Sequence, residues 1–539
     1  MSETLDTGAP PPQAGPTGGP VPADDDRITP AILKIAGVVV LGSIMAILDT
    51  TVVNVALPTF QEEFGVEEYS TVAWTITAYT LALAAVIPVT GWAADRFGTK
   101  RLYMTALALF TTGSVLCATA WSIESLIGFR VLQGLGGGML MPLGMTIMTK
   151  AAGPHRIGRL MAILGIPMLL GPILGPILGG WLIDAASWHW IFLINLPLGI
   201  LAIIYAWRAL APDQPEPSET FDVVGMLLLS PGLALFLYGV SSIPSHGTVF
   251  ATGVLVPGLI GLALMTGFVF WAFRPEHPLL DLRLFVNRNL RAATTVMFLF
   301  AGSFFGALLL APTYFQQVRG ESVLMAGVLM APQGLGAMVT MPIAGRLTDR
   351  LPVGRIVPFG LVAVILGMTG LALSTDPDVP LAQILVCLFV LGMGMGGTMM
   401  PVFTSALKTL ESHQVARGST LINVIQQIAA SVGVAGISVI LTNQMNSSEA
   451  VTAARAIGQA QAQGITVPSW AAEIAQRLGE ALQALALDDL ASSFSVAYWV
   501  AAGALVVTLG VAVGTLPRKH EESHLLDDQP GSAAPTMIH

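Results

Sequence analysis

Residues 91–101 read GWAADRFGTKR, a short basic loop with a single acid, Asp95, between two long apolar stretches. A looser copy, GRLTDR at residues 345–350 followed by Gly354 and Arg355, lies after another apolar stretch in the second half of the chain. Lys and Arg gather in the cytoplasmic loops of most membrane proteins, so one such loop alone would indicate little. Its recurrence indicates a chain built from two similar helical halves.

The composition is that of a membrane protein. Of the 539 residues, 54% are hydrophobic and 11% charged, and the mean hydropathy is +0.73. No soluble core needs that much apolar sequence, so the chain is predicted to be an all-α polytopic membrane protein. Its two cysteines, Cys117 and Cys387, lie in apolar stretches far apart and are interpreted as small buried side chains, not as a disulfide or a metal site.

A helix that crosses a bilayer needs about 20 predominantly apolar residues, and this requirement yields fourteen spans. We predict them at Ile32–Leu57, Tyr69–Ala93, Arg101–Trp121, Ile123–Met148, Leu160–Ile183, Trp190–Leu210, Val223–Ile243, Val249–Phe273, Leu290–Phe315, Met325–Leu347, Ile356–Ser374, Leu381–Leu407, Val415–Leu441 and Phe494–Leu516. Residues 1–29 and 518–539 lack an apolar run and are predicted to be disordered tails.

The positive charges test this count independently, because they concentrate on the cytoplasmic side. With the N-terminus inside the cell, only Arg319, Arg455 and Arg477 fall outside and Arg130 lies within a span, which leaves 20 of the 24 Lys and Arg residues on the cytoplasmic side. An odd number of missed spans would scramble this alternation, so both termini are predicted to be cytoplasmic. The net charge of -9 gives no sign of a nucleic-acid partner.

One polar segment, residues 443–490, is too hydrophilic to span and is predicted to lie outside the cell. It is rich in Ala, with Ile474, Leu478 and Leu482 at helical spacing, which favours an amphipathic helix. A solvated cap without a role of its own stays the alternative.

The fifth predicted span contains GPILGPILGG at residues 171–180. Glycines four residues apart let a neighbouring helix approach closely, and prolines bend a membrane helix at a fixed place. The residues concerned are Gly171, Pro172, Gly175, Pro176, Gly179 and Gly180. By themselves they are also typical of a kinked helix with a purely structural role.

Two ionisable residues lie well inside the predicted spans, where a charge is costly and marks a functional site by default. Asp49 lies eight residues from the outer end of its span and Arg130 seven residues from the outer end of its own, about 12 and about 10 Å at helical rise. Burial disfavours a charged carboxyl group and a nearby cation favours it, so such a pair suits proton coupling. The alternative is a static ion pair that orders the bundle. Glu124 and Asp184 lie at span ends, where they face water.

These motifs together resemble the major facilitator superfamily, and within it the 14-span drug:proton antiporter-2 family. The glycine–proline run resembles the family's antiporter motif, and LDTTVVNVALP at residues 48–58 resembles its first-span signature. Similar stretches lie at residues 190–199, 277–282 and 314–320. The superfamily's loop motif matches Gly91, Asp95, Arg96, Gly98, Lys100 and Arg101, and the fourth-span signature matches Arg130, Gln133, Gly134 and Gly136. Two departures are His189, where the family commonly has Arg, and Leu351-Pro352-Val353 in the second loop.

The resemblance implies a major facilitator fold with a six-helix bundle at residues 30–210, two linking transmembrane helices at 211–275 and a second six-helix bundle at 276–517. It implies a proton-coupled antiporter that exports lipophilic drugs or amphiphilic compounds by alternating access, with Asp49 and Arg130 as the proton-coupling residues. The implied location is the inner (plasma) membrane. The implied partners are lipid, protons and small amphiphiles, without a cofactor beyond the proton gradient, and a periplasmic or envelope partner is left open.

A path for lipophilic substrates needs polar groups that hold water and apolar groups that repack around varied ligands. We predict that the cavity is lined by Asn54, Trp74, Tyr79, Gln133, Met141, Met145, Asn195, Gln333, Met399, Asn423 and Gln426. Methionines cluster at residues 139–148 and 393–400, although methionine is also ordinary filler in membrane helices. Asp49 is the one buried acid, which favours monovalent cationic or neutral amphiphiles.

Two other functions are alternatives to a drug antiporter. A dedicated exporter of one endogenous metabolite, such as a siderophore, an antibiotic or a lipid, fits the same motifs. An enzyme is not predicted, because the sequence shows no nucleophile–base set and no metal-type histidine spacing, and the glycines at residues 134–138 lack the Lys and the strand of a P-loop.

Overall fold

The computed structural model describes residues 28–66, 69–152, 156–213, 220–243, 250–411, 414–463 and 465–519. All regular secondary structure in these ranges is helical, as predicted. The two predicted tails lie outside the described residues except at positions 28–29 and 518–519, as do several side chains within the fifth span.

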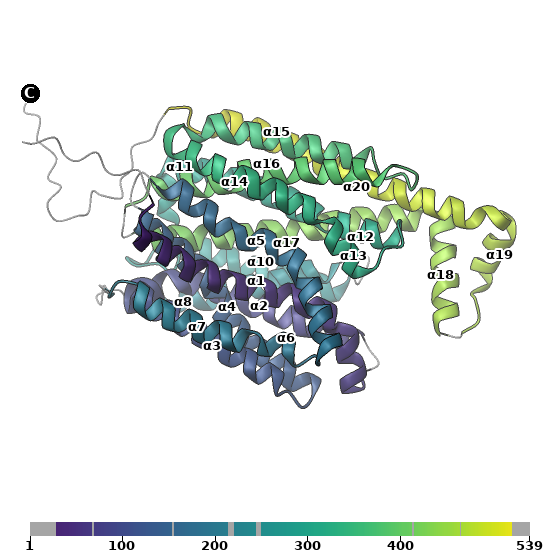
Figure 1. Cartoon of the computed structure of the whole chain (residues 1–539), viewed down its shortest axis with the longest axis horizontal. Coiled ribbons are helices and arrows are strands. Elements are labelled where there is room, and N and C mark those ends of the chain that lie inside the picture. The colour runs from purple at the N-terminus through teal and green to yellow at the C-terminus, as the bar shows by residue number, and fades with distance from the viewer. Residues whose placement is uncertain are drawn as a thin grey trace, which may run out of the picture.

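The first half of the chain forms a bundle of six spans (Figure 1). Its last span is divided at Ile194 into a single helical turn and a longer helix. The helices are α1 (Pro30–Phe64), α2 (Tyr69–Phe97), α3 (Thr99–Ala118), α4 (Ile123–Ala152), α5 (Ile157–Ala185), α6 (Trp190–Leu193) and α7 (Asn195–Ala209).

The ends of α1 show why the sequence starts and stops a helix there. The Thr29 hydroxyl accepts a hydrogen bond from Ile32 N at 3.4 Å, and Pro30 occupies the first turn, where a backbone N–H has no helical partner. Gly65 follows the last turn in the left-handed conformation, at φ 61°, which favours glycine. α1 therefore continues one to two turns beyond the predicted apolar stretch.

Two further helices, α8 (Val223–Ser241) and α10 (Thr252–Trp271), link the halves. Small residues let them pack closely on each other, and α8 also contacts α2 and α17 (Val415–Ser447), one helix of each half. The buried Asp222 carboxylate fastens the start of α8 to the end of α10, since it accepts hydrogen bonds from Gly225 N at 2.7 Å, Trp271 Nε1 at 2.9 Å and Leu279 N at 3.2 Å.

The second half forms the other bundle, and its first two spans are each divided into two helices. These four helices are α11 (Arg288–Leu308), α12 (Leu310–Gln317), α13 (Val323–Leu329) and α14 (Ala331–Arg350). The remaining spans are α15 (Val353–Ala372), α16 (Leu381–Lys408), α17 and α20 (Leu482–Thr515). The helix that contains the last predicted span, which starts at Phe494, begins earlier, at Leu482, because Ala, Leu and Gln are good helix formers outside apolar stretches too.

The predicted amphipathic segment is helical and forms a hairpin, α18 (Glu449–Gln463) and α19 (Ser469–Leu478), that projects beyond the bundle (Figure 1). Ile474 and Leu478 pack in a small apolar cluster with Leu482, as their spacing predicted. The Ser448 hydroxyl donates to Asp489 Oδ2 at 2.7 Å and so ties the base of the hairpin to α20.

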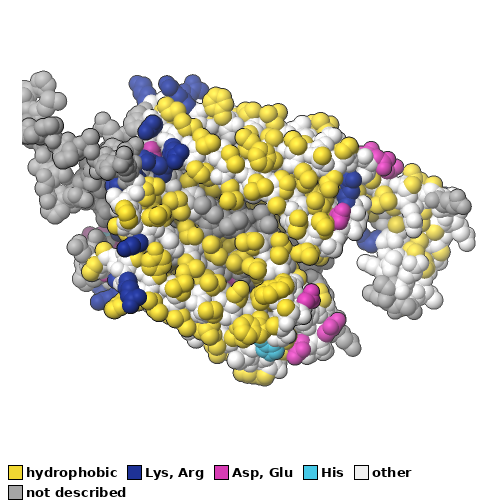
Figure 2. Space-filling view, in the orientation of Figure 1, with side chains coloured by type: hydrophobic (Ala, Val, Ile, Leu, Met, Phe, Trp, Pro, Cys, Tyr) yellow, Lys and Arg dark blue, Asp and Glu magenta, His cyan; other side chains and the backbone are white. Residues whose placement is uncertain are grey.

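Thirteen segments of the described chain are long and apolar enough to cross a membrane. The one predicted span that is not among these thirteen is the fifth, Leu160–Ile183, and it corresponds to α5, a helix of 29 residues. Figure 2 shows a broad hydrophobic surface between two polar ends, with Lys and Arg at the left end and Asp and Glu at the right end, toward α18 and α19. We call these the basic end and the acidic end. The chain is a multi-pass membrane protein.

Candidate functional site

Asp49 and Arg130 meet inside the first bundle. Asp49, in the middle of α1, has 2% of its surface exposed, and Arg130 of α4 is fully buried. Arg130 Nη1 donates a hydrogen bond to Asp49 Oδ2 and forms an ion pair with it. The two residues predicted to share a depth in the membrane are therefore in direct contact.

Two amides complete the shell around the carboxylate. Gln133 Nε2 donates to Asp49 Oδ1 at 2.7 Å, and Asn195 Nδ2 at the start of α7 reaches the same oxygen at 3.3 Å. Gln133 Oε1 accepts from Arg130 Nη1 at 2.7 Å, so this amide bridges the acid and the guanidinium. Each oxygen of the buried Asp49 side chain therefore has a hydrogen-bond donor.

Arg130 is held from three sides. Its Nε donates to Thr75 O at 3.0 Å, and its guanidinium carbon lies 4.1 Å from the centre of the Tyr79 ring. Its Nη2 has no hydrogen-bond partner within the described chain. A buried guanidinium that lost the charge of Asp49 would be left without a counter-ion, which is strongly unfavourable. The guanidinium and the carboxylate therefore depend on each other for charge balance.

The sequence did not point to Ser114, and Cys117 was interpreted only as a small buried side chain. Both side chains face Gln133 from α3. Ser114 Oγ accepts from Gln133 Nε2 at 3.1 Å and from Asn195 Nδ2 at 2.9 Å. Cys117 is buried as predicted, but its thiol also donates to Gln133 Oε1 at 3.5 Å. Their spacing of three places both side chains on one face of α3, which was the signal that a polar neighbour lay opposite.

The acids of the two loop copies each bind the opposite half of the molecule. Asp95 of α2 accepts from Arg417 of α17, with 3.3 Å between Oδ2 and Nε. Asp349 of α14 accepts from Arg159 Nε at 3.0 Å and from Gly158 N at 2.9 Å, both at the start of α5. The repeated sequence therefore forms two related cross-bundle contacts at the basic end.

Lys100 and Arg101 of the first copy bind the segment that ends the first bundle. The Asp213 carboxylate accepts from the backbone N–H groups of Lys100 and Arg101 at 2.7 and 2.9 Å and so caps the start of α3. Lys100 Nζ donates to the carbonyl groups of Trp207 and Leu210 at the end of α7, each at 2.7 Å. Lys100 and Arg101 thus fasten α3 within the first bundle, whereas Asp95 reaches across to the second.

Other contacts close the two bundles on each other near the basic end. A Cβ atom on Gly158 would lie 2.4 Å from Gly345 O, so only glycine allows this approach of α5 and α14. The hydroxyls of Thr146 and Ser419 lie 3.2 Å apart, and Asn423 Nδ2 lies 3.2 Å from Met145 Sδ. The two halves are therefore in direct contact at this depth.

The glycine–proline run packs α5 against α1 next to Asp49. A Cβ atom on Gly175 would lie 2.0 Å from Thr51 Oγ1, and one on Gly171 would lie 2.1 Å from Ile47 Cγ2. Thr51 Oγ1 also donates to Gly171 O at 3.1 Å. Gly179 approaches Val52 less tightly, whereas Gly180 has open space. The side chains of Pro172 and Pro176, and hence their predicted bend, lie outside the described residues.

The eleven residues predicted to line one cavity fall into separate places. Tyr79, Gln133 and Asn195 belong to the Asp49 cluster. Trp74 is 39% exposed and stacks on Tyr238 of α8 with 5.4 Å between the ring centres, and Asn54 is exposed and bonds its own helix. The remaining six are Met141, which accepts from Ser43 Oγ at 3.9 Å, the buried Met145, Gln333, Met399 and Asn423, and the half-buried Gln426. Residue type alone did not show which face of each helix points inward.

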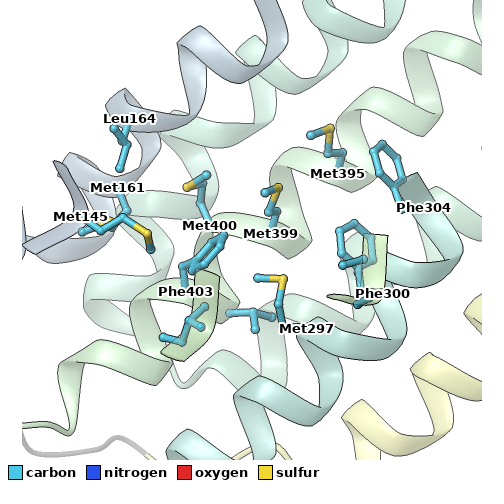
Figure 3. Packing of buried hydrophobic residues seen from close by; sticks show 14 of the residues in the cluster. Met145, Met161, Leu164, Met297, Phe300, Phe304, Met395, Met399, Met400 and Phe403 are labelled. Atoms are coloured by element: carbon cyan, nitrogen blue, oxygen red, sulfur yellow. The ribbon is translucent and has the colours of Figure 1, made fainter. Parts of the chain in front are cut away.

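The predicted methionine clusters do meet where the bundles join. Figure 3 shows Met145 and Met161 facing Met400, with Met399 and Met297 beyond. Independently, a Cβ atom on Gly165 of α5 would lie 3.2 Å from Met400 Cε and 2.6 Å from Met341 Sδ. Flexible thioethers from both halves therefore form an interface that is able to repack.

A repeated helical bundle with a buried acid–guanidinium cluster is the architecture of a secondary transporter. Residues 39–434 match the family model described as Major Facilitator Superfamily, so the chain belongs to this superfamily. It is 48% identical over 501 residues to the "Multidrug resistance protein B homolog" of Mycobacterium tuberculosis (strain ATCC 25618 / H37Rv), an alignment that covers 93% of this chain and 92% of the relative.

A further relative and two solved structures agree with this assignment to the superfamily. The chain is 30% identical over 397 residues to the "Multidrug export protein EmrB" of Haemophilus influenzae, which covers 73% of this chain and 77% of the relative. The solved structure of the proton:xylose symporter XylE superposes with a TM-score of 0.57 at 13% identity over 91% of this chain and 97% of the symporter. That of the human organic anion transporter MFSD10 gives 0.57 at 15% identity, over 88% and 100%. At these identities the solved structures indicate the shared fold.

Proposed function

We propose that the protein is a proton-coupled antiporter of the inner membrane that exports lipophilic or amphiphilic compounds. The observation that carries this proposal is the closed cluster of Asp49, Arg130, Gln133 and Asn195 at the centre of the first bundle. It contains an acid whose charge is balanced by one guanidinium, and neutralisation of that acid removes the balance. The two relatives with multidrug names support the substrate class.

In this proposal the basic end faces the cytoplasm, as the charge distribution predicts. The contacts of Asp95 with Arg417 and of Asp349 with Arg159 then close the protein toward the cytoplasm. A proton from outside neutralises Asp49, the cluster rearranges, and the bundles rock open toward the cytoplasm, where the proton leaves and a substrate enters. The return to the closed arrangement exports the substrate.

Reconstitution in liposomes tests the proposal. Purified protein is given an imposed pH gradient, and a trapped pH indicator reports proton movement when ethidium, tetraphenylphosphonium or an uncharged dye is added. Proton flux with several unrelated amphiphiles is the expected result. A response to one compound alone would identify a dedicated exporter, and the absence of proton flux with every amphiphile would contradict the proposal.

The cross-bundle ion pairs give a first prediction. In the double variant Asp95→Asn, Asp349→Asn the closed arrangement loses two charge pairs, and we expect about a threefold rise in access from the basic end. The measurement is the rate of maleimide labelling of a cysteine placed at Thr146, in a background without Cys117 and Cys387. Thr146 is buried where the halves meet.

The control for this prediction exchanges the charges instead of removing them. Asp95→Arg combined with Arg417→Asp keeps the ion pair between these two positions with its charges exchanged, so this variant should label close to the parental rate. Asp95→Arg alone should label faster. Equal rates in all four proteins would show that these ion pairs do not hold the bundles together.

A further inference from the structure

A cavity lies in the second half of the molecule, at the acidic end. Its volume is about 780 Å³, within the range of small-molecule sites. It is an open pocket lined by the region around Leu309, by α12 and α17, by the hairpin helix α18 and by the first turns of α20. None of these elements contributes to the Asp49 cluster, so the cavity is separate from the site described above.

The cavity is apolar inside and has a cation on its rim. Leu309, Leu441 and Leu487 line its walls, and Arg455 of α18 is the one charged residue among its described lining. The wall along α12 runs from Gln317 back to Leu309, about 12 Å at helical rise. Arg455 itself is exposed. A ligand with an apolar chain and a charged head would therefore place the chain along the leucines and the head at the rim.

The hydrogen bonding of Arg455 indicates the charge of that head. Arg319 donates to Tyr314 Oη at 3.0 Å and to the Val379 carbonyl at 2.6 Å, and Arg477 forms an ion pair with Glu449. These are the two other cations of the predicted outer side. Arg455 donates only to the Met445 sulfur, at 3.3 Å, within the described chain. A thioether is a weak acceptor, so the guanidinium keeps most of its capacity for an anion.

We propose that this cavity binds a single-chain anionic amphiphile, with its carboxylate, sulfate or sulfonate head on Arg455 and its chain between α12, α17 and α20. The site is additional to the transport path, and it stands whether or not Asp49 couples transport to protons. It gives the α18–α19 hairpin a purpose, since α18 supplies the residue that selects the charge.

A photoreactive dodecanoate that carries a diazirine in its chain tests this site on the full-length protein in phosphatidylcholine nanodiscs. We expect saturable labelling of peptides from α12, α17 or α20. The matched diazirine alcohol, which lacks the charge, should label about tenfold more weakly at equal concentration. Equal labelling by the acid and the alcohol would overturn the role of Arg455.

Two arginine variants on the same hairpin separate charge recognition from a general effect on α18 and α19. Arg455→Gln should weaken saturable dodecanoate labelling about tenfold, whereas Arg477→Gln, whose arginine is already paired with Glu449, should change it less than about twofold. Ala454→Trp, which fills the cavity, should remove labelling by both probes. Unchanged labelling in Arg455→Gln or in Ala454→Trp would overturn the proposal.

Two further measurements test where the probe binds and whether the site prefers a single-chain ligand. Asp49→Asn should leave dodecanoate labelling unchanged, and loss of labelling in that variant would place the ligand in the transport path instead. Addition of phosphatidylglycerol to the nanodiscs should not displace the probe. Displacement by this two-chain lipid would contradict a single-chain ligand.

Discussion

Asp49→Asn is expected to abolish proton-driven exchange while leaving the protein folded in the membrane. The side chains are nearly equal in size, but Asn stays neutral at every pH and removes the charge that balances Arg130. We expect substrate-dependent proton flux to fall about 100-fold or more, to the level of empty liposomes, as for loss of an essential proton-transfer group. Binding of substrate, measured by quenching of tryptophan fluorescence, should persist.

A matched variant separates the role of Asp49 from a loss of negative charge in general. Asp184 of α5 is exposed near the outer end of its span, so Asp184→Asn makes the same chemical change without touching the cluster. It should retain exchange within about twofold, since an exposed charge contributes little. Proton-driven exchange at the parental rate in Asp49→Asn would refute the assignment of the coupling acid.

Gly175→Leu should impair exchange because it disturbs the packing of α5 on α1, without changing any charge. The backbone of α5 lies so close to α1 that even a Cβ atom would be 2.0 Å from Thr51 Oγ1, two residues from Asp49. Overpacking of this kind costs about 1–3 kcal/mol, and it would separate the two helices where the cluster depends on their distance. We expect exchange per inserted molecule to fall about tenfold or more.

The neighbouring glycine provides the control. Gly180 lies in the same helix and the same motif, but a Cβ atom there meets no atom within 4 Å. Gly180→Leu should therefore insert and exchange within about twofold of the parent, as a side chain that meets only lipid does. Both variants are measured for the amount in the membrane and for flux. If Gly175→Leu inserts poorly but exchanges normally per molecule, the run has only a structural role.

The buried position of Asp49 could be predicted from the sequence, whereas the partner of Asp95 could not. Asp49 and Arg130 could be found because an ionised residue stands out in an apolar span, and their depth follows from counting residues. The partner of Asp95 could not, because Arg417 is 322 positions away and lies in the opposite half. The sequence places one acid among several cations in that loop, but only the packing of the halves shows which charges meet.

The predicted cavity illustrates the same limit. Polar and methionine residues were selected by type, and the structure distributes them over the Asp49 cluster, the interface of the bundles and the exposed surface near α8. A span that is apolar all round gives little periodicity, so its inward face is not marked in the sequence. The rotation of each helix about its axis, which its neighbours set, decides which of these residues share a site.

The sequence by itself determined that the chain is a helical membrane protein with many spans and two related halves, because span length, charge distribution and the repeated loop are local properties that the bilayer imposes. Only the tertiary structure decided that Ser114, Gln133 and Asn195 surround the Asp49–Arg130 pair, and that each loop acid binds the other bundle. Those contacts join residues far apart in the chain, and they depend on how closely and at what rotation the helices pack.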